Sequence, residues 1–260
     1  MTIATLWTAF PHAGDYTFDA VSVKNHWQRL HQGDCEPIPT DAAVLQAWVL
    51  FHNGDFQQAF DAGLRVGGDG ITVANKAASI YANYLETSEK VKLEMFMDIA
   101  NRAEAQQKDD PKKVNAWYWQ AYALGRYGQG ISVAKALVQG LGAKVKTALA
   151  QAIHLAPKHA DAHIALATFH AEVVDKVGSL IGGMTYGAKK DIGLALFREA
   201  LKLNPTSAIA MIEYANGMVM LEGDEKMLEA TQLYEQAAAS KPLDATEWLD
   251  VEIAKAELED

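Results

Sequence analysis

The sequence predicts an all-α fold, a right-handed solenoid built from antiparallel helix pairs. Three segments share one pattern, an apolar helix that stops at a proline, and they end at Pro157, Pro205 and Pro242. Each is followed by another segment with helical periodicity, and helix pairs that recur along a chain are the sequence signature of a solenoid. No alternation of period two is sustained anywhere in the sequence, so strands are not expected.

The composition limits the class of protein. Hydrophobic residues make up 50% of the 260 residues, enough to bury a core and well above a disordered composition. The net charge of −10 argues against binding nucleic acid or an anionic membrane surface, because both need clustered Lys and Arg. The chain has one cysteine, Cys35, so no intramolecular disulfide is expected, which fits a reducing compartment.

The N-terminal segment favours a cytoplasmic protein. No Lys or Arg precedes Lys24, and Pro11 ends the short apolar run, whereas a secretory signal has a basic start and a longer apolar stretch. The sequence has no window of about 20 uninterrupted apolar residues, so no membrane span is expected.

Residues 1–40 are predicted to be an N-terminal extension that packs on a repeat domain over residues 41–260. Within the extension, Val23, Trp27 and Leu30 have helical spacing, and a glycine and two prolines then break the pattern. The repeat domain starts with helices expected over residues 41–53, 56–67, 71–86, 88–107 and 109–128.

Local signals define the ends of these helices. Gly54 and Gly67 are typical C-terminal stops. Ser88 suits a helix start, and Pro111 is expected in the first turn of the helix over 109–128, where proline is tolerated.

Two glycine-rich inserts interrupt the second half, near residues 128–142 and 178–188. Neither contains GxxxxGK[ST] or GxGxxG, so they are not phosphate-binding loops. Both carry apolar residues that must be buried, either as lids over the concave face or in an oligomer contact, and both alternatives stay open. The remaining helices are expected over residues 143–156, 159–177, 189–204, 206–223, 224–240 and 244–259.

The proline spacing and the side-chain sizes resemble the tetratricopeptide repeat (TPR) family. Pro157 and Pro205 are 48 residues apart, which is 14 more than the 34 residues of a TPR. Pro205 and Pro242 are 37 residues apart, which is 3 more. Small residues fall where antiparallel helices would cross, and large residues fall between them. The small residues are Ala47, Ala59, Ala167, Ala200, Ala215 and Ala237, and the large ones are Phe56, Phe197, Leu203, Met218 and Tyr234.

A narrower resemblance covers residues 125–205. Its marks are a helix that starts near residues 142–146, the junction LAPKHADAHIALA, and a glycine-bearing insert before the next helix. In these marks the chain resembles the TPR accessory protein of tripartite (TRAP) transporters and the regulator-of-microtubule-dynamics proteins, which implies an internal cleft for a small ligand. The chain lacks the signal peptide and lipid-anchored cysteine of the transporter protein, which argues against a periplasmic transporter role.

The aromatic segment NAWYWQAYALGRYG is the strongest candidate for a binding surface. If Ala121 holds the small crossing position, helical periodicity places Tyr118, Tyr122 and Arg126 on the side that is concave in a TPR. Tyr and Arg are enriched among residues that dominate binding energies. The alternative is that Trp117 and Trp119 belong to the core and the tyrosines seal helix junctions. The same periodicity adds three candidates from later repeats: Thr168, Glu172 and Asn216.

Catalytic and metal-binding chemistry have little support. The sequence contains no GxSxG, HExxH or CxxC motif, and acidic neighbours would raise the pKa of Cys35. His159 and His163 share a helix face at spacing i, i+4 and are weak metal candidates. The alternative is that His159 caps a helix and His163 fills a helix crossing.

The sequence therefore predicts a non-enzymatic scaffold or adaptor that binds a protein or peptide segment in its concave groove, without a cofactor. The alternative is a carrier that holds a small amphipathic or apolar ligand in a cavity closed by the glycine-rich inserts. A homo-oligomer remains open.

Overall fold

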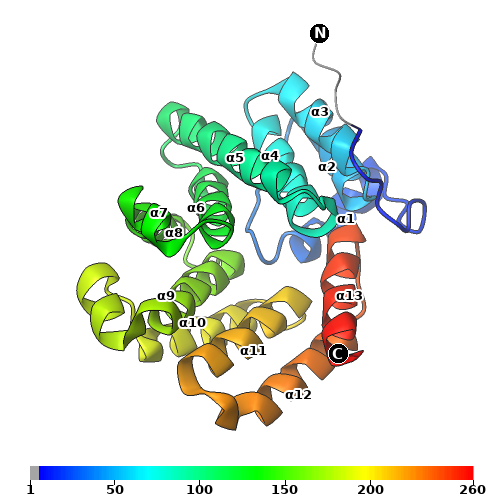
Figure 1. Ribbon diagram of the computed structural model, residues 1–260. Coiled ribbons are helices and arrows are strands. Elements are labelled where there is room, and N and C mark those ends of the chain that lie inside the picture. Colours follow the sequence, from blue (N-terminus) through cyan, green and yellow to red (C-terminus); the bar gives the residue numbers. More distant parts are fainter. Residues whose placement is uncertain (1–5, 260) are drawn as a thin grey trace. The chain divides into compact units, whose positions relative to one another are not determined.

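A computed structural model describes residues 6–259, apart from the side chains of residues 133, 134 and 137. Over this range the chain is helical and has no strand, which confirms the all-α prediction (Figure 1). Residues 1–5 of the predicted extension lie outside the described residues. None of the described helices combines the length and apolar character that a bilayer-spanning segment requires.

The helices follow one another with short connections. The first are α1 (Ala20–Leu30), α2 (Ala42–His52), α3 (Phe56–Val66), α4 (Gly70–Ile80), the π-helical turn η1 (Tyr81–Leu85), α5 (Glu89–Asp109) and α6 (Val114–Gln129). They are followed by α7 (Val133–Val138), α8 (Leu141–Leu155), α9 (Ala160–Tyr186), α10 (Lys190–Leu203), α11 (Ala208–Glu222), the 3-10 turn η2 (Asp224–Lys226), α12 (Met227–Ala238) and α13 (Ala245–Glu259).

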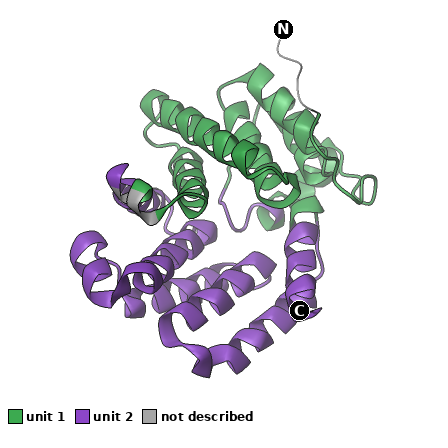
Figure 2. Ribbon diagram, in the orientation of Figure 1, with its two compact units in different colours: residues 1–29, 36–136, 244–246 green, residues 30–35, 137–243, 247–260 purple. Residues whose placement is uncertain are grey.

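The chain divides into two compact units (Figure 2). Unit 1 comprises residues 1–29, 36–136 and 244–246, and unit 2 comprises residues 30–35, 137–243 and 247–260. These boundaries differ from the sequence expectation of an extension over 1–40 and a repeat domain over 41–260.

In unit 1, consecutive helices from α2 to α6 pack on each other, and α4 also contacts both α2 and α6. Contact with the next helix and the next but one is the packing expected of stacked helix pairs. Ala47 and Ala59, predicted at crossing positions, have no exposed surface. The largest fully buried side chains of this unit include Trp48, Phe51 and Ile99.

Unit 2 repeats this arrangement from α8 to α12, and here α9 also contacts α11. The predicted crossing residues are all buried with 0% exposed surface: Ala167, Ala200, Ala215 and Ala237. Phe197 packs in one cluster with Ala167 and Ala200, and its ring is stacked on Tyr214 at 5.3 Å between centroids. The predicted division into small crossing residues and large filling residues is therefore confirmed at these positions.

Helix starts were predicted with mixed success. The Ser88 side chain caps α5 by accepting the Val91 N–H at 3.5 Å, as expected. The placement of Pro111 in the first turn of α6 was wrong, because α6 begins at Val114. The Pro111 carbonyl instead accepts a hydrogen bond from the Trp117 indole at 2.9 Å, which holds the preceding turn against the helix.

The segment 178–188 was expected to interrupt the helix over 159–177, but most of it is helical. The interruption is confined to Gly178, whose φ of 81° breaks α9, and the helix resumes and runs to Tyr186. Gly187, with a φ of 61°, ends it in the left-handed conformation that favours glycine.

Residues outside the helical repeats pack against the helices of unit 1. The Trp7 ring stacks on Tyr81 at 4.2 Å, and the Phe18 N–H donates to the Asn53 side chain at 2.7 Å. The buried His52 imidazole lies 2.6 Å from the Asp244 carboxylate, so α2 also holds residues 244–246 in this unit.

Candidate functional site

The first three candidates lie on α6 in unit 1. Tyr118 is buried, with 6% of its surface exposed, and its ring lies 4.8 Å from Trp119 and 6.1 Å from Tyr122. Tyr122 and Arg126 are half-buried, and the Arg126 guanidinium stacks over the Tyr122 ring at 5.3 Å. The buried Tyr118 ring therefore packs beside the Tyr122 ring, and Tyr122 and Arg126 are the two residues of this group that reach the surface.

The Arg126 side chain is held in place from two sides. Besides the stacking on Tyr122, its guanidinium donates to the Gln129 amide oxygen at 3.2 Å. A guanidinium that is ordered before binding loses less rotational freedom when it meets a carboxylate or phosphate. The pair of Tyr122 and Arg126 can therefore offer an aromatic face and an ordered cation next to each other.

The other three candidates lie in unit 2, where α9 packs on α11. The Thr168 hydroxyl on α9 donates to the Glu213 carboxylate on α11 at 3.0 Å. One turn further along α11, the exposed Asn216 amide oxygen accepts a hydrogen bond from the Tyr234 hydroxyl at 2.8 Å. Glu172 pairs with Lys176 on the same helix at 3.4 Å. Adjacent helices thus place a row of polar side chains on one face of this unit.

Sequence reasoning missed two members of this row, Glu213 and Tyr234. Glu213 stands three positions before Asn216, so the same helical periodicity that selected Asn216 would have found it. Tyr234 was assigned only to the core. Its hydroxyl reaches Asn216 because α12 packs against α11, and that contact depends on tertiary structure.

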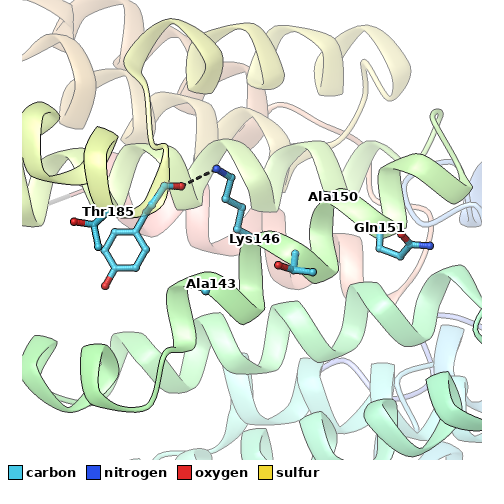
Figure 3. Close-up of a pocket in the computed structure, with 7 residues that line it drawn as sticks. Ala143, Lys146, Ala150, Gln151 and Thr185 are labelled. Carbon is cyan, nitrogen blue, oxygen red and sulfur yellow. Dashed lines mark hydrogen bonds between the residues drawn. The ribbon is translucent and has the colours of Figure 1, made fainter.

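Unit 2 also contains an open depression of about 500 Å³ between α8 and the end of α9 (Figure 3). The Lys146 ammonium donates to the Tyr186 carbonyl at 2.7 Å, where a positive charge is favourable at the C-terminus of a helix. Hydroxyl, amide and methyl groups line the depression together with Lys146, so it offers mixed polar and apolar contacts. The lining residues are Ala143, Lys146, Thr147, Ala150, Gln151, Thr185 and Tyr186.

His159, which caps α9, and the two histidines within this helix make local structural contacts. The buried His159 side chain caps the helix by accepting the Ala162 N–H at 3.0 Å, and the His163 ring contacts the His159 carbonyl at 2.9 Å. The ring of His170 accepts the Lys189 N–H at 2.9 Å, and burial lowers its pKa to about 4. Across the described part of the chain, no group of three or more His, Cys, Asp or Glu residues could hold a metal ion.

Cys35 is poorly suited to nucleophilic chemistry. Burial, together with the charges of Asp34 and Asp161, raises the pKa of its thiol to about 11. The thiolate is the reactive form, so little of it exists near neutral pH. The predicted upward shift is confirmed, although burial contributes more to it than the acidic neighbours do.

Comparisons with known proteins support the fold. No family model matches the sequence, and no curated protein matches it. The crystal structure of a thermophilic TPR protein from Thermus thermophilus is similar, with 14% sequence identity and a TM-score of 0.57. The match covers 82% of this chain and 97% of that chain. By fold, the chain is a TPR-like helical repeat protein, and the narrower resemblance to transporter accessory proteins and microtubule regulators stays a prediction.

Proposed function

We propose that this chain is a non-enzymatic scaffold that binds a protein or peptide segment on the concave side of its helical repeats. The observation that carries the proposal is the hydrogen bond between Thr168 on α9 and Glu213 on α11, because it joins polar side chains of successive repeats on one face. A row of side-chain donors and acceptors on adjacent helices suits the backbone and side chains of a peptide.

The candidates in each unit have a distinct role in this proposal. In unit 2, Glu172 and Asn216 supply hydrogen bonds along the row. In unit 1, Tyr122 supplies apolar area, and the ordered guanidinium of Arg126 pairs with a carboxylate of the partner. Tyr118 positions Tyr122 and is not a contact residue, because it is buried.

A displayed library of random peptides tests this proposal without knowledge of the natural partner. The affinity of the peptides enriched on the wild-type chain is then measured for two double variants. One combines Tyr122→Ala and Arg126→Ala, and the other combines Glu172→Ala and Asn216→Ala. We expect each variant to weaken its peptides at least about tenfold, a loss of about 1.4 kcal/mol.

The matched control is Lys202→Ala on α10, whose side chain is 77% exposed and pairs only with Glu199 of the same helix among the described contacts. Binding should not change in this variant. If neither double variant weakens any peptide that the wild type binds, the concave side is not the binding surface.

The depression beside Lys146 supports a second candidate function, a carrier of a small amphipathic ligand. Its volume of about 500 Å³ lies in the range of small-molecule sites, and its lining combines a cation with methyl and aromatic groups. Native mass spectrometry of the freshly purified chain distinguishes the two functions. A bound ligand, seen as extra mass on the wild type and absent from Thr147→Trp, would support the carrier. A chain without any bound ligand would support the peptide scaffold.

A further inference from the structure

The last two turns of α9, residues 179–186, expose large apolar side chains to solvent. Leu180 is 76% exposed, Ile181 is 58% exposed and Met184 is 82% exposed. At positions i, i+1 and i+4, these side chains share one face of the helix. We call these three residues the apolar tip of unit 2. Isolated exposed apolar residues are common on soluble proteins, but three on one short helix mark an interaction surface.

Local packing fixes the direction of the apolar tip. The break at Gly178 separates this segment from the rest of α9. On the inner side, a Cβ on Gly182 would lie 3.0 Å from the Val173 side chain and 3.7 Å from Ala188, so this face is closely packed. The Tyr186 ring packs on Gly142, and Lys146 caps the Tyr186 carbonyl. The apolar residues thus point outward because the opposite face of the segment is occupied.

Lysines accompany the apolar tip in an otherwise acidic chain. Lys176 precedes the segment, Lys189 and Lys190 follow it, and no Asp or Glu occurs between residues 176 and 190. The packed helix α8 contributes two further lysines, Lys144 and Lys146, and contains no Asp or Glu at all.

The acidic groups nearest to these lysines leave a local excess of positive charge. Glu172 pairs with Lys176 at 3.4 Å, and Glu222 pairs with Lys190 at 3.3 Å. Asp175 directly precedes Lys176, and Asp191 directly follows Lys190. Lys144 and Lys189 are exposed, and their ammonium groups form no ion pair with any described residue. Two lysines therefore remain available to an external anion beside the apolar tip.

We propose that unit 2 docks on the surface of an anionic lipid bilayer, with Leu180, Ile181 and Met184 inserted among the headgroups and Lys144 and Lys189 facing the lipid phosphates. Short helices with an apolar face and flanking lysines bind this interface by combining apolar burial with electrostatic attraction. The proposal is independent of the concave peptide site, because none of the three inserted side chains and neither of the two lysines belongs to that site.

The net charge of −10 does not exclude this docking, although from composition alone it argues against an anionic membrane partner. Charges farther away than the screening length, about 8 Å at physiological salt, contribute little at the contact. The local arrangement of lysines and carboxylates at the apolar tip therefore decides the attraction. A composition averaged over the whole chain cannot show this arrangement.

A second copy of the chain fits the apolar tip less well than a bilayer does. A stable protein interface buries about 800 Å² on each partner, far more than three side chains supply. A symmetric dimer through this face would also bring equivalent lysines together. A bilayer needs only a few inserted side chains, and its anionic headgroups balance the lysines.

Vesicle co-sedimentation tests the proposal with the full chain. The probes are phosphatidylcholine vesicles with and without phosphatidylserine. The wild type should bind the phosphatidylserine vesicles and lose binding as salt rises. The variant Leu180→Gln, Ile181→Gln, Met184→Gln should lower the partition coefficient at least about thirtyfold. The variant Lys144→Gln, Lys189→Gln should lower it by about fivefold for each lysine at low salt.

Unit 2 offers a matched control on α12. Met227 is 52% exposed and Leu228 is 72% exposed. Their neighbours in the chain are three acidic residues, Asp224, Glu225 and Glu229, and one lysine, Lys226, which pairs with Glu229. The variant Met227→Gln, Leu228→Gln should bind vesicles like the wild type. Circular dichroism should show unchanged helicity in all three variants, because every substituted side chain is exposed.

Three results would overturn the proposal. The wild type could fail to bind phosphatidylserine vesicles, or the apolar tip variant could bind them as the wild type does. Sedimentation could also show that the wild type is a dimer and does not bind vesicles, whereas the apolar tip variant is a monomer. The apolar tip would then be a contact between copies of this chain.

Discussion

The carbonyl oxygen of Gly70 lies 2.4 Å from the position that a Cβ atom on Gly63 would occupy. The relationship is reciprocal, because the Gly63 carbonyl lies 2.6 Å from the corresponding position on Gly70. Helices α3 and α4 thus meet with their backbones in contact, and no side chain separates them at this crossing. Close approach of this kind is what small residues permit in stacked helix pairs.

Gly63→Ala should therefore destabilise unit 1. The new methyl group would meet backbone atoms of α4, which cannot move aside as a flexible side chain can, and overpacking of this kind costs about 1–3 kcal/mol. Urea unfolding followed by circular dichroism measures the change. Gly125→Ala on α6 is the control, because nothing lies within 4 Å of its Cβ position. It should stabilise the helix by up to about 1 kcal/mol, and equal effects of the two substitutions would contradict the argument.

Asp244→Ala should destabilise unit 1 as well. His52 has no exposed surface, and its ring contacts the Asp244 carboxylate at 2.6 Å. Asp244→Ala removes this hydrogen bond from the buried imidazole, and the loss of a buried hydrogen-bond partner costs about 1–3 kcal/mol. The exposed pair of His12 and Asp15, at 3.0 Å, supplies the control. Asp15→Ala should change the free energy of unfolding by less than about 1 kcal/mol, and a similarly small effect of Asp244→Ala would show that His52 does not depend on this contact.

His170 should make the stability of unit 2 depend on pH. Burial and the nearby Lys146 lower its pKa from 6.5 to about 4, and Asp191 opposes this only in part. The unfolded chain therefore binds more protons than the folded chain between these values. The contribution of neutral His170 to the free energy of unfolding is fully present above pH 6.5 and is lost as the pH falls toward 4. The total loss is on the order of 3 kcal/mol.

The comparison with His170→Asn isolates this contribution. Other groups titrate equally in both chains, so the difference between their free energies of unfolding should shrink as the pH is lowered from 7 to 4. Chemical unfolding across this range measures it. A difference that stays constant with pH would show that His170 has the same pKa in the folded and unfolded chains.

Features determined by local sequence were predicted correctly. Helices with apolar periodicity and proline ends depend on neighbouring residues, and so does the cap formed by Ser88. The crossing residues Ala167 and Ala215 could be predicted because a TPR-like repeat requires small side chains at fixed positions. Both are buried as expected.

Features that depend on tertiary contacts were not predicted. Gly178 and Gly182 both suggested a break, but only Gly178 breaks α9, whereas Gly182 permits close packing on Val173. Periodicity likewise placed Tyr118 on the same face as Tyr122. It gives the direction of a side chain around the helix, but it cannot show which neighbours cover that side chain. Tyr118 is covered, and Tyr122 reaches the surface.

Cys35 should react slowly with alkylating reagents in the folded chain. With its pKa raised from 9.0 to about 11, mainly by burial, the thiolate fraction at pH 8 falls about a hundredfold. Alkylation by iodoacetamide should therefore be slower by about this factor in buffer than in urea, where the thiol is exposed and its pKa is ordinary. Asp161→Asn removes one of the charges that raise this pKa, so it should speed the reaction of the folded chain and leave the reaction in urea unchanged. Equal rates in buffer and urea would mean that Cys35 is an accessible thiol of ordinary acidity, and its environment in unit 2 would have to be more open than the packing of residues 30–35 indicates.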